Sequence, residues 1–161
     1  MQKITPFLWF EDQAEAAVNF YISVFRDSRI VNVTRYGAAG AEAAGRPKGT
    51  VMTIVFQLEG EEFIALNGGP AFAFSPAISF VVKCGTQEQV DRLWDKLSQG
   101  GEALQCGWLQ DKYGVSWQIV PTILGEMLSD KDSAKAERVM RAMLEMNKLD
   151  INTLKKAYEQ A

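Results

Sequence analysis

The sequence contains an internal repeat, and this repeat constrains the fold more than any other feature of the chain. Two amphipathic helices are predicted to begin near Asp12 and Thr86, about 74 residues apart. A strand-like run precedes each helix, Ile4–Phe10 in the first case and Ile78–Cys84 in the second, and further β-type segments follow. The order is βαβββ twice over, which predicts an α+β fold built from two such modules.

Each predicted helix has its own start signal. Asp12-Gln13-Ala14-Glu15 and Thr86-Gln87-Glu88-Gln89 both have the spacing of a capping box, in which the first and fourth side chains satisfy free N–H groups. Apolar residues then recur at helical spacing, to about Arg26 in the first helix, and Gly100-Gly101 ends the second. These signals favour helices at matching places in the two modules.

The remaining segments follow from strand and turn signals. The predicted later strands are Arg29–Tyr36, Thr50–Leu58 and Glu62–Asn67 in the first module, and Glu102–Leu104, Cys106–Gln110 and Val115–Pro121 in the second. After Pro121 apolar residues recur at helical spacing, which predicts a C-terminal helical tail. The expected divisions are residues 1–70, 71–122 and 123–161, within one structural domain.

Charge and composition exclude several classes of function. The net charge is −3 and the sequence pI is near 5.1, so the chain offers no basic surface for nucleic acid or anionic membranes. There is no histidine, which excludes every mechanism that uses an imidazole as base or metal ligand. Neither an export signal nor a membrane span is evident, and the two cysteines are expected to stay reduced in the cytoplasm.

The glycine-rich segment 37–49 could be mistaken for a phosphate-binding loop. It has Gly-x4-Gly spacing at Gly40 and Gly45, but Arg46-Pro47 follows where such a loop needs Lys and then Ser or Thr at the start of a helix. The segment is therefore predicted to be a mobile loop between two strands, and any function it has would be that of a lid.

Several segments resemble the vicinal oxygen chelate superfamily, which includes glyoxalases, extradiol dioxygenases and drug-sequestering resistance proteins. Within it the chain looks like the PhnB-like group, often called 3-demethylubiquinone-9 3-methyltransferase. The resemblance covers essentially the whole chain, and it implies cupped mixed sheets that enclose a small-molecule site. The segments that carry it are Phe10-Glu11-Asp12, Asn19-Phe20-Tyr21, Ser79-Phe80-Val81-Val82, the hairpin from Gly107 to Pro121, and the tail from Ala136 onward.

The same resemblance implies where a metal would be held in other members. The ligand positions fall at Gln118 on the last strand, at about Ala77 and Ala65 on the fifth and fourth, and near Pro6 on the first. None of these side chains is a metal ligand of the expected kind. We therefore expect no metal and no cofactor, and the sequence also has no glycine-rich strand-to-helix turn for a methyl donor.

The cup that remains is predicted to be neutral. Alternation along the strands places Ser79 on the same side as Val81, and Ser116 with Gln118, whereas Trp117 points into the core. The candidate ligand-binding residues are Asn67, Ser79, Cys106, Trp108, Ser116 and Gln118. Amide and hydroxyl groups beside one large aromatic suit an uncharged or planar ligand.

Three functions are compatible with this sequence. The favoured interpretation is a metal-independent small-molecule binding protein. A metal-independent enzyme is the alternative, acting on a small aromatic or quinone-like substrate through Cys106 or a bound water. A structural or interaction module with a filled cup is the third. A homodimer is also expected, because the apolar stripe of the tail, with Val139, Met140, Met143, Leu144, Leu154 and Tyr158, must be buried on its own chain or on a partner.

Overall fold

The protein forms two compact units in a computed structural model that describes residues 2–160. The units are Met1–Phe74 and Ser75–Ala161. The terminal residues 1 and 161 of the expected divisions lie outside the described residues. Each unit holds one βαβββ module, so the predicted α+β fold is confirmed. Across the described chain, none of the helices combines the length and apolar character needed to cross a membrane.

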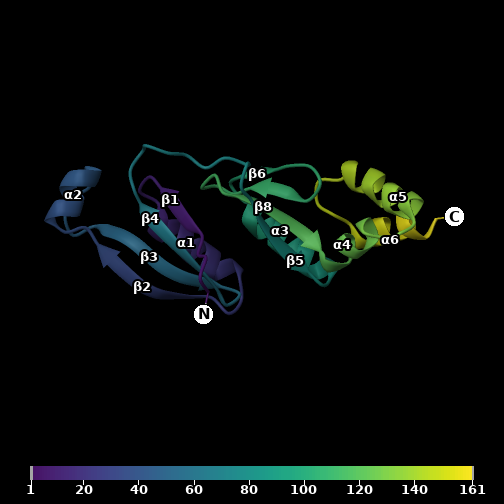
Figure 1. The fold of residues 1–161 in the computed structure, drawn as a ribbon, viewed down its shortest axis with the longest axis horizontal. Coiled ribbons are helices and arrows are strands. Elements are labelled where there is room, and N and C mark those ends of the chain that lie inside the picture. The colour runs from purple at the N-terminus through teal and green to yellow at the C-terminus, as the bar shows by residue number, and fades with distance from the viewer. Residues whose placement is uncertain (1, 161) are drawn as a thin grey trace. The chain divides into compact units, whose positions relative to one another are not determined.

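The first unit contains one four-stranded mixed sheet (Figure 1). Its strands lie in the order β1-β4-β3-β2, with β1 parallel to β4 and the other pairs antiparallel. The tight turn between β3 and β4 has Glu59 and Gly60 both at positive φ. The elements are β1 (Phe7–Phe10), α1 (Ala14–Val24), β2 (Arg29–Arg35), α2 (Ala38–Ala44), β3 (Val51–Leu58) and β4 (Glu61–Asn67).

Helix α1 covers one face of this sheet and forms the core of the first unit. Its small and aliphatic residues recur at helical spacing, so one stripe is apolar and packs on β3 and β4. Alternate residues of the strands meet that stripe, while their neighbours face away from α1. The core residues with the least exposure are Phe10, Ala14, Ala17, Val18, Tyr21, Val24, Ile54, Phe56 and Ala65.

The start of α1 differs from the prediction. The residue before the helix is Gln13, and no side chain of the expected capping box bonds a backbone N–H of the first turn. The Asn67 side chain takes this role, because its Oδ1 accepts a hydrogen bond from the Ala14 N–H at 2.8 Å. Glu15 accepts a bond from Asn67 Nδ2 instead of bonding back to the helix start. The cap of α1 therefore comes from the end of β4.

Segment 37–49, predicted to be a loop, contains the short helix α2. Five of its seven residues are alanine, which has the highest helix propensity. The helix ends at Gly45, whose φ of 67° is the left-handed conformation that glycine accepts readily. Gly40 lies against the Tyr36 ring, since a Cβ on this glycine would be 3.3 Å from Cδ1 of the ring. The Tyr36 ring therefore packs against α2 at Gly40.

The second unit repeats the arrangement with shorter strands. Its sheet has the order β5-β8-β7-β6, with β5 parallel to β8. The cap of α3 was predicted correctly, because Thr86 Oγ1 accepts a bond from the Gln89 N–H at 3.2 Å. Gln89 Oε1 in turn accepts a bond from the Gly85 N–H at 2.8 Å. The elements are β5 (Phe80–Cys84), α3 (Gln87–Ser98), β6 (Glu102–Ala103), β7 (Trp108–Gln110) and β8 (Ser116–Pro121).

The tail forms three helices that bury apolar residues against one another. They are α4 (Thr122–Leu128), α5 (Ser133–Leu144) and α6 (Ile151–Glu159), drawn in yellow-green and yellow in Figure 1. Val139, Leu149 and Leu154 have no exposed surface in this cluster. Of the tail stripe, Val139 and Leu154 are fully buried and Met143 and Tyr158 partly buried on the same chain, which weakens the reason given above for a homodimer. Leu144 is an exception and stays 54% exposed.

Hydrogen bonds join the tail to the segment before β7 and to α3. The Cys106 and Gly107 N–H groups donate to the carbonyls of Met146 and Asn147, each at 2.8 Å. The Gln87 side chain donates to the Leu149 carbonyl at 3.0 Å and accepts from a backbone N–H of α6 at 2.7 Å. The tail is therefore a structural part of the second unit.

Candidate functional site

The second sheet has one face that points away from α3, which we call the open face. Cross-strand pairing places Val81 beside Gln118, and Gln118 beside Trp108. Ser116 pairs with Gln110 on the same face. The intervening residue Trp117 is 3% exposed in the core, as the alternation along β8 predicts. Four of the sequence-derived candidates, Ser79, Trp108, Ser116 and Gln118, are therefore close in the fold.

A side-chain hydrogen bond lies at the centre of the open face. Gln118 Nε2 donates to Ser79 Oγ at 2.9 Å, which fixes the Gln118 amide over the sheet. The half-buried Trp108 indole and the exposed Val81 flank this amide. The cross-strand neighbours of Gln118 are uncharged, so they offer apolar contact and hydrogen bonds, whereas the exposed Lys83 lies on the same face two residues beyond Val81.

Ser116 has a buried hydroxyl without a hydrogen-bond partner among the described residues. The residue is 2% exposed, and its Oγ is shielded from solvent. An unsatisfied buried hydroxyl costs stability, and such groups in native proteins often bond to a water or a ligand. Ser116 thus lies on the open face by register, but its side chain is covered and is not accessible to solvent.

Cys106 lies outside the strands of the second sheet. Its φ of 60° is a left-handed conformation, and its N–H is bonded to the tail. The residue is half-buried, whereas Cys84 is buried at the end of β5. Burial raises the pKa of the Cys84 thiol to about 11, so this thiol stays protonated near neutral pH. Cys106 is the more accessible of the two thiols.

Three residues are placed differently from the expectation. Asn67 is 3% exposed and faces α1, where its amide also donates to the Val51 carbonyl at 3.1 Å. Ala65 lies on this same face, so the residues of β4 that face away from α1 are Ile64 and Leu66. Asn67 is thus removed from the candidate ligand-binding set. Ile78, the first residue of the predicted strand Ile78–Cys84, precedes β5 and is 74% exposed.

The chain's residues do not fit the metal centre of metal-using relatives. Gln118 is a neutral amide bonded to Ser79, Ala77 lies outside any strand, and Ala65 points into the core. In the register found in the structure, Ile64 and Leu66 take the place of Ala65 on the face away from α1. Neither side chain has an atom that could bind a metal. Between residues 2 and 160 no three His, Cys, Asp or Glu side chains cluster in a way that could hold a metal ion.

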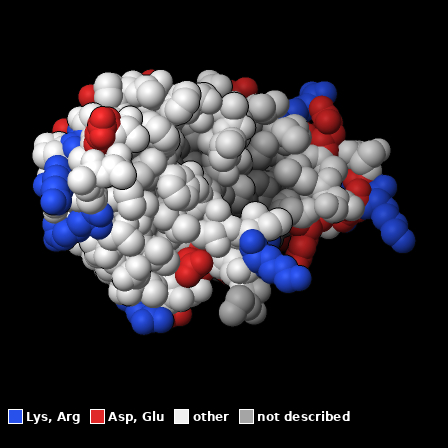
Figure 2. Space-filling model, turned by 60° about the vertical axis from the view of Figure 1, so that its left-hand side comes forward, with Lys and Arg blue, Asp and Glu red and all other residues white. Residues whose placement is uncertain are grey.

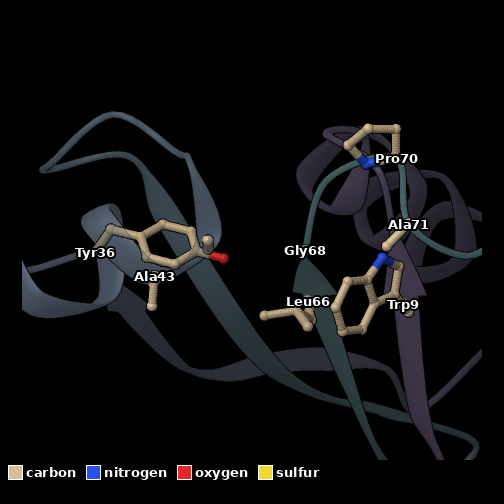
Figure 3. Close-up of a pocket in the computed structure, with 8 residues that line it drawn as sticks. Trp9, Tyr36, Ala43, Leu66, Gly68, Pro70 and Ala71 are labelled. Carbon is tan, nitrogen blue, oxygen red and sulfur yellow. The ribbon is translucent and has the colours of Figure 1, made fainter.

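A pocket in the first unit was not anticipated from the sequence. It has a volume of about 540 Å³ and lies on the sheet face away from α1, beneath α2. Figure 3 shows Tyr36 and Ala43 on one side of this space and Trp9 and Leu66 on the other. From the sequence, the alternation of Leu8, Trp9 and Phe10 along β1 could have predicted that the Trp9 indole lies on this face. The lining residues are Trp9, Tyr36, Ala43, Ala44, Leu66, Gly68, Pro70 and Ala71.

Two βαβββ units, each with a four-stranded mixed sheet packed on one helix, define a member of the vicinal oxygen chelate superfamily. The family model described as 3-demethylubiquinone-9 3-methyltransferase matches residues 2–120. The chain therefore belongs to this PhnB-like family. No curated protein sequence matches the chain.

Solved structures agree with this assignment. A PhnB protein from Bacillus cereus, described as a 3-demethylubiquinone-9 3-methyltransferase, is 42% identical over 75% of this chain and all of that one, with a TM-score of 0.67. Two more distant structures share the fold. Protein PA1353 from Pseudomonas aeruginosa is 17% identical over 75% of this chain and 98% of its own, with a TM-score of 0.61. The fosfomycin resistance protein FosX from Mesorhizobium loti is 14% identical over 81% of this chain and all of its own, with a TM-score of 0.56.

Proposed function

We propose that the chain is a metal-independent protein that binds an uncharged small molecule without covalent chemistry. The observation that carries this proposal is the Gln118–Ser79 hydrogen bond at 2.9 Å on the open face of the second sheet. A ligand carbonyl or hydroxyl can bond to the outer side of this pair while an aromatic or aliphatic part contacts Trp108. The amide is held in place before binding, which reduces the entropy lost on association.

The uncharged residues beside Gln118 favour an uncharged ligand. The cross-strand neighbours of Gln118 are Val81 and Trp108, so an ionic group in contact with these two side chains would lose hydration without touching an opposite charge. In the view of Figure 2 most of the surface is uncharged, and Lys, Arg, Asp and Glu occur in small separate groups. A neutral ligand therefore suits this face better than an anion or a cation.

The test combines a ligand screen with one variant pair. Neutral aromatic and quinone-like compounds are screened by thermal shift, and the affinity of each hit is measured by calorimetry. The Gln118→Leu variant is expected to lower the affinity of a true ligand at least about tenfold. This change corresponds to the loss of one hydrogen bond to a buried polar group. Gln99→Leu is the control, because Gln99 is an exposed residue that follows α3. Equal affinity in both variants would refute this site.

The family description favours a second candidate, a metal-independent enzyme acting on a quinone-like substrate. Cys106 is its one accessible thiol in the described chain, and the open face would hold the substrate. Each hit is therefore incubated with the protein, with and without S-adenosylmethionine, and products are analysed by mass spectrometry. Turnover abolished by Cys106→Ala would replace the binding proposal with this one. A protein that binds nothing in the screen would favour a structural or interaction module.

We also propose a homodimer, on different grounds from the tail. Strand β2 is an edge of the first sheet, and its Ile30, Val31 and Val33 side chains are 42%, 44% and 41% exposed. An exposed apolar edge strand is commonly covered by another chain. Light scattering at micromolar concentration tests this, and Val31→Lys should shift a dimer toward monomer.

The two unpaired cysteines support a cytoplasmic location.

A further inference from the structure

The end of β4 contains the one place in the sequence where glycine follows asparagine, at Asn67-Gly68. A glycine nitrogen attacks the preceding side-chain amide with the least hindrance, because glycine has no Cβ and a flexible backbone. Asn67 is also the buried one, at 3% exposure, whereas the other asparagines are exposed: Asn19, Asn32, Asn147 and Asn152. We propose that Asn67 is a site of covalent modification by deamidation, which occurs when the end of β4 opens and whose products cannot restore the native first unit.

The reaction needs water as its only co-reactant. The Gly68 nitrogen loses its proton and bonds to Cγ of Asn67, the Cγ–Nδ2 bond breaks, and ammonia leaves with that proton. Water then opens the resulting cyclic imide at either of its carbonyl carbons. The products are aspartate at position 67 and isoaspartate, in which the backbone continues through the former side-chain carbonyl. Nothing is oxidised or reduced.

The fold requires asparagine at position 67. Its Oδ1 accepts a hydrogen bond from the Ala14 N–H at 2.8 Å. Its Nδ2 donates to Glu15 Oε1 at 2.8 Å and to the Val51 carbonyl at 3.1 Å. An ionised aspartate only accepts hydrogen bonds, so it cannot replace the Nδ2 donor.

The fold also requires glycine at position 68. A Cβ on Gly68 would lie 2.4 Å from Cε2 and 2.6 Å from Cζ2 of Trp9, which is far inside contact distance. The indole is held there because its Nε1 donates to the Gly69 carbonyl at 2.9 Å (Figure 3). Packing around β4 therefore maintains a reactive asparagine–glycine pair that neither residue could leave without cost.

The closed structure protects this pair. The Gly68 N–H donates to the Phe10 carbonyl at 2.8 Å, and the Asn67 carbonyl accepts from the Tyr36 hydroxyl at 2.5 Å. Attack requires the Gly68 N–H to leave its acceptor and the Asn67 amide to leave its three partners. The reaction therefore proceeds from a locally open state, and its rate follows the fraction of chains in which the end of β4 is open.

Neither product fits the closed structure. In aspartate, a carboxylate oxygen replaces the Nδ2 group beside Glu15 Oε1 and the Val51 carbonyl, so acceptors face one another and two negative charges meet. Isoaspartate adds a carbon to the backbone, which displaces the Gly68 N–H from the Phe10 carbonyl. Each event therefore removes the cap of α1, and the modified chain favours the open state.

The first experiment compares the full chain under native conditions and in urea. Trypsin cleaves after Lys48 and Lys83, and the peptide 49–83 contains Asn67 as its only asparagine. Mass spectrometry detects the replacement of the amide by a carboxyl group, and chromatography separates aspartate from isoaspartate. We expect conversion of Asn67 in urea to be at least about tenfold faster than in the native protein.

Matched variants test the route. Tyr36→Phe removes the hydroxyl that holds the Asn67 carbonyl, so it should raise the native rate about three- to tenfold and leave the rate in urea unchanged. Tyr158→Phe makes the same change in the second unit and should alter neither rate. Gly68→Ala is measured only in urea, where folding is irrelevant, and should slow the reaction at least about tenfold because its Cβ hinders the attack.

The consequence of modification is tested with Asn67→Asp, which has the sequence of one product. The variant should lower the midpoint of thermal unfolding by at least about 4 °C, since it places a carboxylate beside Glu15. Asn32→Asp is the control, because Asn32 is exposed on β2 and its change should leave the midpoint nearly unaltered.

Several results would overturn the proposal. Equal rates in the native chain and in urea would show that the closed structure does not protect Asn67. An unchanged native rate in Tyr36→Phe would show that the reaction does not proceed through opening at the end of β4. A native chain that stays unmodified both with and without Tyr36→Phe would refute the site, and an Asn67→Asp variant that unfolds at the temperature of the natural chain would show that the product fits the closed structure.

Discussion

The Asn67 side chain caps α1 from across the first unit, since its Oδ1 accepts a hydrogen bond from the Ala14 N–H at 2.8 Å, between residues 53 positions apart in the chain. Its Nδ2 donates to Glu15 Oε1 at 2.8 Å and to the Val51 carbonyl at 3.1 Å. One buried amide thus joins the end of β4, the start of β3 and the first turn of α1.

Removing this amide should destabilise the protein. Asn67→Leu leaves the Ala14 N–H and the Val51 carbonyl without their side-chain partner, so the free energy of unfolding should fall by about 2–4 kcal/mol. Urea denaturation monitored by circular dichroism measures the change. Asn32→Leu is the control, because Asn32 is exposed on β2, and it should change stability by less than about 0.5 kcal/mol. A similar small effect at both positions would contradict the capping role.

The tail should stabilise the second unit through Leu149. This residue has no exposed surface, and a Cβ on Gly107 would lie 3.0 Å from its Cδ1, so the side chain packs directly on the hairpin. Leu149→Ala should cost about 2–5 kcal/mol of unfolding free energy, as for other buried leucines. The matched change Leu144→Ala removes a 54% exposed side chain and should cost far less. If the two variants unfold at the same urea concentration, the tail does not pack as described.

The two thiols should react at different rates. Burial raises the pKa of Cys84 to about 11, so at pH 8 this thiol is almost entirely protonated and also shielded, whereas Cys106 is half-buried. With Ellman's reagent, one thiol per chain should react rapidly and the second only after denaturation. Cys106→Ser should remove the rapid phase, and Cys84→Ser should keep it. Two rapid phases in the native protein would be inconsistent with the burial of Cys84.

The stability of the tail should depend on pH through Tyr158 and Asp130. The Tyr158 hydroxyl donates to Asp130 Oδ2. This bond raises the pKa of Tyr158 above 10.0 and lowers the pKa of Asp130 below 3.8. The contribution of Asp130 is present above pH 3.8 and lost as pH falls through its lowered pKa. The contribution of Tyr158 is present below pH 10.0 and lost as pH rises through its raised pKa.

Tyr158→Phe isolates this pair, because phenylalanine keeps the ring that lies under Lys135 Nζ at 5.0 Å. The variant should melt at a lower temperature than the natural chain between about pH 5 and pH 9, and the difference should shrink at both more acidic and more alkaline pH. Thermal melts across this range measure it. A difference that persists unchanged well above pH 10 would show that the hydroxyl does not act through Asp130.

Features that depend on neighbouring residues were predictable from the sequence. The Thr86 cap of α3 is one of them, since the atoms involved lie three residues apart. The Asp111–Gly114 turn is another, with the Gly114 N–H bonded to the Asp111 carbonyl at 3.0 Å. The same applies to the burial of Trp117 beside the outward-facing Gln118, because alternation fixes faces within one strand.

Features that depend on distant residues were decided only by the tertiary structure. Alternation relates Ala65 to Asn67, but only the packing of α1 on the sheet determines that both face the helix. The cap of α1 comes from β4 because Asn67, at the end of that strand, lies beside the first turn of the helix. No pattern of neighbouring residues in the sequence predicts this proximity. The Trp9 pocket likewise needs Gly68 and α2 to be brought next to β1, and tertiary packing alone does this.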